Sequence, residues 1–283
     1  MKSVLRELQS MNAVGAGQVA NLSVPTGGPT YKAFYFEYLH TASTKANEAK
    51  FGTDIETVKV KINGDALWDI TGQELLDINN YYGYSMVDGY FPLFFARPEF
   101  LNPAEEDNFS LGTLGGQKVS VEVKIASGAT APELKMYSVL AYGQQRNLGQ
   151  LIRVRGTSYG TSISAGEFEI HDLPVKGPEP GRGVKAIHVK SGNVGSHEIL
   201  LNGQTISEST AELQGLFQDH EAFQTVSRNP VANYHHIDFT GNRYSGIVPM
   251  TNVADFRMKL NFTGAEASGV RILHEEVIGQ RDR

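Results

Sequence analysis

The chain has 283 residues, of which 40% are hydrophobic and 20% charged, so it is long enough for one large or two medium globular domains. Its formal net charge is -6 and its Lys and Arg residues are scattered, which argues against nucleic-acid binding. No apolar run approaches the roughly 20 residues that cross a bilayer, and the absence of cysteine excludes disulfides, thiolate metal sites and cysteine nucleophiles.

Residues 1–15 are interpreted as an N-terminal amphipathic segment. A helix over Met1–Met11 would place four apolar side chains on one face, namely Val4, Leu5, Leu8 and Met11. Such a helix is expected to lie along a membrane surface, to pack beneath a neighbouring subunit or to dock on its own domain. Arg6 and Glu7 interrupt the apolar region that a signal peptide requires, so export by that route is not expected.

The rest of the chain has the sequence pattern of a β-protein, with short Val-, Ile-, Phe- and Tyr-rich segments between Gly, Pro and Asn residues. The first series of predicted strands is 18–24, 31–39, 57–62, 90–96, 118–126 and 134–142. The second series is 167–173, 184–190, 197–201, 235–240, 256–262 and 270–278. The two series follow the same order.

Four short sequences of the first half recur in unchanged order in the second half. They are GQVANLSVP from Gly17 and GEFEIHDLP from Gly166, YKAFYFEY from Tyr31 and VKAIHVKS from Val184, the Asn-Gly phrases at Asn63 and Asn202, and SGATAPELKMY from Ser127 and TGAEASGVRIL from Thr263. Such a repeat predicts two tandem domains of similar fold. We place them at 16–145 and 146–283, with the boundary somewhere in 143–165.

The repeated Asn-Gly phrase predicts a tight turn after a strand, because Asn and Gly tolerate positive φ. Thr71–Glu74 and Ser209–Glu212 read as capping boxes, which predict the short helices ELLDINNYY and ELQGLFQDH. An antiparallel domain with one helix at the same place in each half indicates an all-β fold of two tandem jelly-roll β-sandwiches, each with a short inserted helix.

The histidines are candidate metal ligands, because two-domain cupin enzymes share this plan and need a His-x-His pair, a Glu and a later His. His235 and His236 are adjacent, so in a strand they point to opposite faces and cannot share one ion, and the chain contains no His-x-His. We interpret His171, His188 and His274 as strand positions half in contact with a core. The sequence thus predicts no catalytic residue and no cofactor.

Two further segments have a chemical and a structural interpretation. The run Glu105, Glu106 and Asp107 offers oxygen ligands to a cation such as calcium, although a solvated loop is the commoner use of such a run.

Gly112–Gly116 lacks the ending of a phosphate loop and is expected to form a bend before strand 118–126. Acids for glycoside hydrolysis are plentiful, but no pair is singled out. Metal ligands therefore stay unknown.

Aromatic residues gather at Trp68 and between residues 79 and 95. Aromatic side chains are enriched in protein interfaces, so part of this region is a candidate interface, and core filling is the competing explanation.

Several short sequences along the chain match one known family in number and order. In the first half they are MKS at Met1, NAVGAG at Asn12, LFFARPE at Leu93, FSLGTLGG at Phe109 and VEVKI at Val121. In the second half they are EIHDLP at Glu169, AIHVK at Ala186 and the Asn202-Gly203 pair. With these patches the chain resembles the double jelly-roll major capsid proteins of corticovirus-type phages, which are tailless and icosahedral and carry an internal membrane. None is a catalytic signature, so the number and order of the patches give the resemblance its specificity.

The resemblance implies a structural protein of the virion that is not an enzyme. Three chains would form a homotrimeric, pseudo-hexagonal capsomer, and capsomers would tile an icosahedral shell over an internal membrane. Implied partners are neighbouring capsomers, a penton or spike protein and minor membrane proteins, with membrane contact through Met1–Met11. Loops 40–56, 79–90 and 204–233 are candidates for the outer surface or for contacts between capsomers.

Synthesis and assembly in the host bacterial cytoplasm would fit the absence of cysteine and of a signal peptide. Family virions are also associated with calcium, but no ligand position can be transferred to this chain.

The alternatives are a two-domain cupin-like or carbohydrate-processing enzyme and a glycan-binding β-sandwich protein. The enzyme would hold a transition metal or turn over a sugar, and the binding protein would bind a sugar as a monomer.

Overall fold

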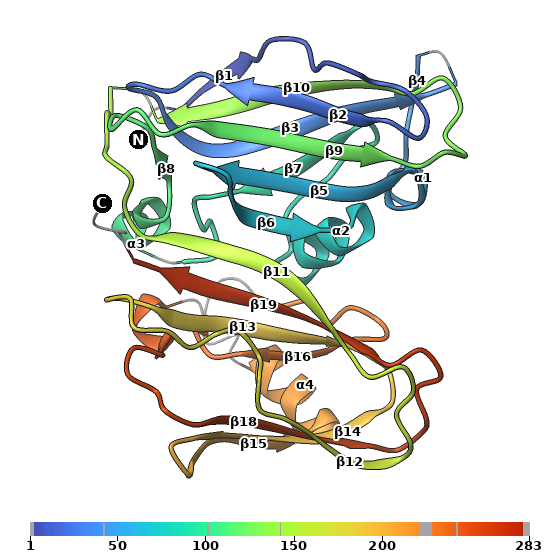
Figure 1. The fold of residues 1–283 in the computed structure, drawn as a ribbon, viewed down its shortest axis with the longest axis vertical. Coiled ribbons are helices and arrows are strands. Elements are labelled where there is room, and N and C mark those ends of the chain that lie inside the picture. Colours follow the sequence, from blue (N-terminus) through green and yellow to red (C-terminus); the bar gives the residue numbers. More distant parts are fainter. Residues whose placement is uncertain are drawn as a thin grey trace. The chain divides into compact units, whose positions relative to one another are not determined.

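The computed structural model describes residues 3–41, 43–100, 102–141, 143–220, 228–241 and 243–279. The chain forms two compact units, Met1–Ile152 and Arg153–Arg283, and each is built mainly from antiparallel strands (Figure 1). Among the described residues, no helix is long and apolar enough to cross a membrane.

The first unit has two sheets and three short helices. Its strands are β1 (Ser3–Glu7), β2 (Val19–Val24), β3 (Thr30–His40), β4 (Thr44–Lys45), β5 (Ile55–Ile62), β6 (Asp65–Ile70), β7 (Tyr90–Phe94), β8 (Leu111–Gly112), β9 (Val119–Ile125) and β10 (Glu133–Ala141). Its helices are α1 (Glu48–Asp54), α2 (Gly72–Tyr81) and α3 (Pro103–Asn108). One sheet has the order β1-β10-β3-β4, with β7 and β8 also paired to β3, and the other contains β6-β5-β9-β2. Alternate residues of β2 are buried, as expected for a strand with one face on a core.

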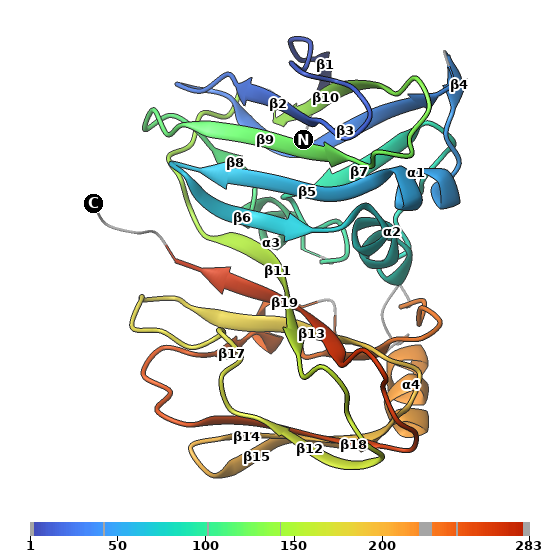
Figure 2. The same ribbon diagram turned by 45° about the vertical axis from the view of Figure 1, so that its right-hand side comes forward.

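The second unit repeats this plan. Its elements are β11 (Leu151–Tyr159), β12 (Gly166–Ile170), β13 (Gly183–Lys190), β14 (Val194–Leu201), β15 (Gln204–Thr210), α4 (Ala211–His220), β16 (His235–Asp238), a 3-10 turn (Tyr244–Gly246), β17 (Val248–Pro249), β18 (Phe256–Phe262) and β19 (Val270–Ile278). One sheet has the order β12-β18-β14-β15, and the other contains β16-β13-β19-β11 with β17 also paired to β13. Figure 2 shows the two sheets as separate layers of this unit. Apolar side chains of both layers, such as Ile187, Ile199 and Leu260, form one core between them.

The two units are copies of one jelly-roll topology. The sheet β6-β5-β9-β2 corresponds to β15-β14-β18-β12, and β3 with its partners β10, β7 and β8 corresponds to β13 with β19, β16 and β17. Each strand predicted from the sequence has a counterpart in the structure, with ends that differ by a few residues. The fold prediction is therefore confirmed as two tandem jelly-roll β-sandwiches.

The Asn-Gly turns close corresponding hairpins. Asn63 and Gly64 join β5 to β6 with φ of 52° and 94°, and Asn202 and Gly203 join β14 to β15 with φ of 49° and 80°. Positive φ at both central residues is the geometry that such a two-residue turn needs. Each Asn side chain also accepts a backbone N–H from the segment before the neighbouring strand: Asn63 from Lys118 at 2.9 Å, and Asn202 from Asp255 at 3.0 Å.

The inserted helices follow these hairpins, but only the first uses the predicted cap. At α2 the Thr71 hydroxyl accepts the Glu74 N–H at 3.1 Å and the Glu74 carboxylate accepts the Thr71 N–H at 2.9 Å, so the capping box is confirmed. At α4 the prediction of a capping box at Ser209–Glu212 is wrong. There the hydroxyl of Thr210 accepts the N–H of Leu213 at 3.2 Å, because β15 continues through Thr210.

The prediction of a helix over Met1–Met11 is also wrong for the described residues of this segment. Ser3–Glu7 is strand β1, which pairs antiparallel with β10 from Ser3 opposite Ala141 to Glu7 opposite Tyr137. An apolar spacing over so few residues does not distinguish a helix from a strand when a sheet edge is available for pairing.

Gly112 in β8 marks a close approach of two backbone segments. A Cβ at this position would lie 2.3 Å from the carbonyl oxygen of Asn147 and 2.6 Å from that of Arg146. We expect Gly112→Ala to destabilise the first unit by about 1–3 kcal/mol, because backbone must move to admit the methyl group. Thermal unfolding followed by the fluorescence of Trp68 measures this. Gly128→Ala, where no atom lies within 4 Å of the added Cβ, is the control, and equal effects of the two substitutions would contradict the prediction.

Candidate functional site

The adjacent histidines of β16 point to opposite faces of their sheet, as predicted. Nε2 of His235 lies 2.8 Å from Nδ1 of His197 on β14, and Nε2 of His197 lies 2.8 Å from the Ser207 hydroxyl oxygen. Nδ1 of His236 instead lies 2.7 Å from Nδ1 of His188 on β13. The first pair therefore links the two sheets, and the second lies on the other face of β16.

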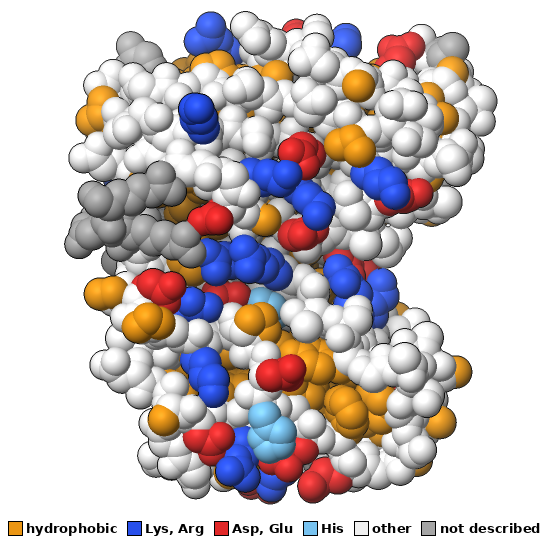
Figure 3. Space-filling model, viewed as in Figure 1, with side chains coloured by type: hydrophobic (Ala, Val, Ile, Leu, Met, Phe, Trp, Pro, Cys, Tyr) orange, Lys and Arg blue, Asp and Glu red, His pale blue; other side chains and the backbone are white. Residues whose placement is uncertain are grey.

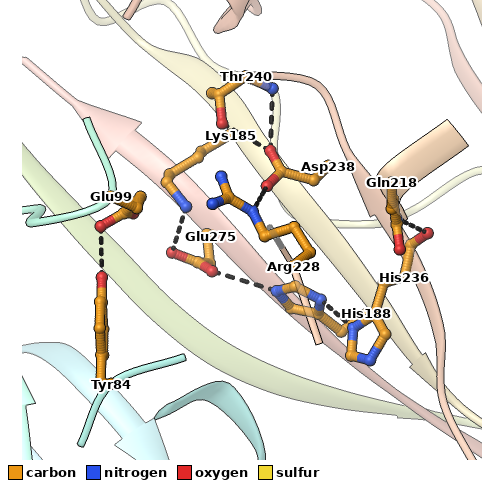
Figure 4. A network of polar contacts seen from close by, with 10 residues as sticks. All are labelled: Tyr84, Glu99, Lys185, His188, Gln218, Arg228, His236, Asp238, Thr240 and Glu275. Carbon is orange, nitrogen blue, oxygen red and sulfur yellow. Dashed lines mark hydrogen bonds and ion pairs between the residues drawn. The ribbon is translucent and has the colours of Figure 1, made fainter. Parts of the chain in front are cut away.

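The second pair belongs to a buried polar chain across β16, β13 and β19 (Figure 4). The N–H of Val231 donates to Nε2 of His236 at 3.2 Å, so Nδ1 of His236 carries the proton that is donated to His188. Nε2 of His188 then donates to a Glu275 oxygen at 3.1 Å, and the other Glu275 oxygen lies 3.5 Å from Nζ of Lys185. In this arrangement Nδ1 of His236 and Nε2 of His188 donate, while Nε2 of His236 and Nδ1 of His188 accept.

Asp238 lies in the same cluster and holds a buried arginine. Its carboxylate accepts from Nε of Arg228 at 2.8 Å, and from the N–H and hydroxyl of Thr240 at 2.9 and 2.6 Å. Burial by itself would raise the pKa of Asp238, but the charges of Arg228 and Lys185 and the bonds from Thr240 outweigh it and lower the pKa to about 2. Asp238 is thus a buried, permanently charged anchor.

Burial is the largest cause of low histidine pKa values in this unit. It lowers the pKa of His197 to about 4 and, together with the nearby His197, the pKa of His235 to about 3. The pKa of His236 also falls well below its usual value. These rings stay neutral at physiological pH and serve as hydrogen-bonding spacers.

The space beside these histidines is small. A cavity of about 120 Å³ is lined by polar residues that include Gln214, Gln218, Tyr234, His235 and His236. Cavities that hold small organic ligands typically measure about 300–1,000 Å³, so this one has room for a few water molecules. Within the described residues, no group of three or more His, Asp or Glu side chains is arranged to hold a metal ion.

The other histidines named from the sequence differ from expectation. His188 and His274 are fully buried rather than half in contact with the core, and Nδ1 of His274 lies 2.9 Å from a Glu276 oxygen. His171 is exposed, because β12 ends before it at Ile170.

The acidic run lies in helix α3 rather than in a solvated loop. Asp107 is buried and forms an ion pair with Lys32 at 2.6 Å, while Glu106 lies 3.9 Å from the same lysine. Lys32 and Lys185 occupy the same position in the repeated phrases YKAF and VKAI. Each unit thus has a lysine of its central strand paired with an acid, and this shared feature was not predicted.

The aromatic region fills the core of the first unit. Trp68, Tyr81 and Tyr82 are buried, and Phe51 stacks on Phe91 with ring centroids 4.0 Å apart. Gly116 has a φ of 74° in the bend before β9, as expected for this glycine-rich segment.

The candidate loops contain regular structure. Residues 40–56 include β4 and helix α1, residues 79–90 include the end of α2, and residues 204–233 include β15 and α4, with 221–227 outside the described part. Over β6, β5 and β9, charged side chains of opposite sign lie next to one another (Figure 3), and the ion pairs there include Lys61 with Glu122 at 2.7 Å. Exposed large apolar side chains occur in two of the candidate loops, at Val87 in 79–90 and on β15 and α4 in 204–233, and also on β1, on β2 and at Leu114.

Known proteins are similar to this chain over nearly its whole length. The family models of the viral coat protein P2 N-terminal and C-terminal domains match residues 5–142 and 151–279. No curated protein sequence matches significantly. Among solved structures, the chain is similar to the major capsid protein P2 of bacteriophage PM2, with 22% identity, a TM-score of 0.84 and coverage of 99% of each chain.

Two further structures share the fold at lower identity. PBCV-1 VP54, fitted into a reconstruction of the virophage Sputnik, has 11% identity and a TM-score of 0.67, with 98% of this chain and 93% of that chain covered. A chain of Sulfolobus Turreted Icosahedral Virus has 12% identity and a TM-score of 0.66, with 98% and 91% covered. The matches to both domain models extend over most of the sequence, and the chain therefore belongs to the viral coat protein P2 family, whose members are structural proteins rather than enzymes.

Proposed function

We propose that this coat protein is the repeating subunit of an icosahedral shell in which three chains form one pseudo-hexagonal capsomer. The observation that carries the proposal is the internal duplication, since both units have the same strand order and the same inserted helix. Three such chains present six similar domains, so a trimer with threefold symmetry imitates a hexagon. A building block of that shape can pack against six neighbours.

The capsomers are proposed to cover an internal membrane and to meet a penton or spike protein at the vertices. Because Ser3–Glu7 is a strand, the amphipathic helix that would have lain on the membrane is not formed there. Membrane contact is proposed through minor membrane proteins of the virion and through the Met1–Met11 segment, and assembly is proposed to take place in the host bacterial cytoplasm. The enzyme and glycan-binding alternatives are not favoured, since the family is one of coat proteins.

The mass of the purified protein tests the trimer. Light scattering after size exclusion should give about 93 kDa, three times the 30.9 kDa of one chain, and dilution should leave this mass unchanged. Obligate interfaces typically bury more than about 2,000 Å², which is the reason for expecting resistance to dilution. A 30.9 kDa monomer at every protein concentration, with and without added calcium, would refute the capsomer.

A further inference from the structure

The ion pair of Lys32 and Asp107 is enclosed within the first unit. Nζ of Lys32 on β3 lies 2.6 Å from Oδ1 of Asp107 on α3, and the two side chains are 11% and 5% exposed. Within the described residues, no hydrogen bond from another group reaches this oxygen. Removing an ammonium and a carboxylate from water is costly unless further bonds compensate for it. A reaction that removes both charges would relieve this cost.

The equivalent lysine of the second unit has a different environment. Nζ of Lys185 lies 3.5 Å from one oxygen of Glu275, and the other oxygen accepts from Nε2 of His188 at 3.1 Å. A second donor stabilises that carboxylate as it stands. The shorter contact and the missing second donor distinguish the pair of the first unit.

We propose that Lys32 and Asp107 condense to an isopeptide bond, an amide between the two side chains. The ammonium group first passes a proton to the carboxylate, which leaves a neutral amine and a carboxylic acid. The lone pair of Nζ then attacks Cγ, and one C–O bond breaks. Nζ loses two protons in all, and the leaving oxygen carries both away as water, so the step needs no oxidant and no other reactant.

The geometry around the pair favours this reaction. Cγ is bonded directly to the oxygen that Nζ contacts, and two groups held together in one molecule react as if they were highly concentrated. The position of Asp107 is fixed by Arg146, whose Nη1 donates to the Asp107 backbone oxygen at 3.0 Å. Oε1 of Glu106 lies 3.9 Å from Nζ of Lys32. A carboxylate at this place can take a proton from the amine and return it to the leaving oxygen.

The bond would join β3 to α3 and close a covalent loop that contains β5, β6, α2 and β7. Closing a long loop reduces the conformational entropy of the unfolded chain, as a disulfide does. The chain has no cysteine, so a disulfide cannot serve this purpose. The isopeptide bond would therefore stabilise the first unit, whether or not the chain forms a trimer.

Intact-mass spectrometry of the full chain in denaturant tests the bond. The wild-type chain should be lighter than its sequence by one water molecule, and digestion should release a branched peptide that contains Lys32 and Asp107. Lys32→Arg keeps a cation opposite Asp107, but a guanidinium stays protonated and does not attack Cγ. The K32R chain should therefore have its full sequence mass and a lower unfolding midpoint. Lys59→Arg, which changes a more exposed ion pair with Asp69, is the control and should keep the loss of water.

The rate of the mass change tests the part played by Glu106. In chains made by cell-free synthesis, Glu106→Gln should slow the loss of water at least tenfold, because an amide cannot carry the proton. Glu105→Gln changes the neighbouring acid of α3 and should leave the rate unchanged. Equal rates for these two variants would remove Glu106 from the reaction.

Two results would overturn the inference. One is a folded wild-type chain that keeps its full sequence mass, both when fresh and after prolonged storage, since Lys32 and Asp107 would then form an ion pair only. The other is a loss of water that persists in K32R, because the bond would then lie elsewhere. If K32R does not fold, the presence or absence of the branched peptide in the wild-type digest decides the question.

Discussion

Asp238→Asn is expected to destabilise the second unit by about 3 kcal/mol, because it removes the charge that balances a buried arginine. The carboxylate of Asp238 and the guanidinium of Arg228 are both buried and lie 2.8 Å apart. Such a loss should lower the midpoint of thermal unfolding by roughly 10 °C for a domain of this size. Calorimetry is the suitable measurement, since the only Trp of the chain, Trp68, lies in the first unit.

Asp255→Asn supplies the matched control. Asp255 accepts from Nε of Arg257 at 2.9 Å, nearly the same geometry, but both side chains are exposed to water. An exposed pair typically contributes less than about 1 kcal/mol, so this substitution should shift the midpoint little. Equal shifts for Asp238→Asn and Asp255→Asn would show that burial of the first pair has no energetic consequence.

Acidification from pH 7 to pH 4 is expected to destabilise the second unit, by on the order of 3 kcal/mol for one buried histidine. The folded pKa of His197 is about 4 and that of His235 about 3, below the ordinary 6.5 of the unfolded chain. Between these values the unfolded chain binds more protons than the folded chain. Stability is therefore fully present above pH 6.5 and falls as the pH drops toward the folded pKa values. The unfolding midpoint measured against pH should follow this course.

The geometry explains why protons disrupt this pair. The contact between His235 and His197 needs one ring nitrogen to accept, and a second proton would place two N–H groups 2.8 Å apart. His197→Gln should reduce the loss of stability between pH 6.5 and 4. His171→Gln changes an exposed histidine and serves as the control. A wild-type midpoint that does not change over this pH range would contradict the role assigned to the buried rings.

Local patterns were sufficient for much of the fold. Alternating apolar residues located the strands of the main sheets, since a strand with one buried face needs this period whatever it pairs with. The sequence analysis did not predict β8 and β17, because two residues are too few to show a period of two. It also did not predict β11, whose first four residues are all buried.

The helix of the second unit shows the limit of a motif. Both Ser209 and Thr210 have hydroxyl groups suited to a cap, and Glu212 favours the first of them in the sequence. The pairing of β15 with β14, which extends from Gln204 to Thr210, moves the start of the helix by one residue. A cap depends on where the preceding strand ends, and that end is set by the partner strand.

By itself the sequence determined the duplication and the paired Asn-Gly turns, because both follow from residue types and their order along the chain. Only the tertiary structure decided the partners of Lys32 and Lys185. Lys32 meets Asp107 of α3, whereas Lys185 meets Glu275 of β19. The apolar side chains of α4 likewise point outward only because buried amides occupy its inner face. Partners and directions depend on segments that are distant in the chain, and periodicity within one element carries no information about them.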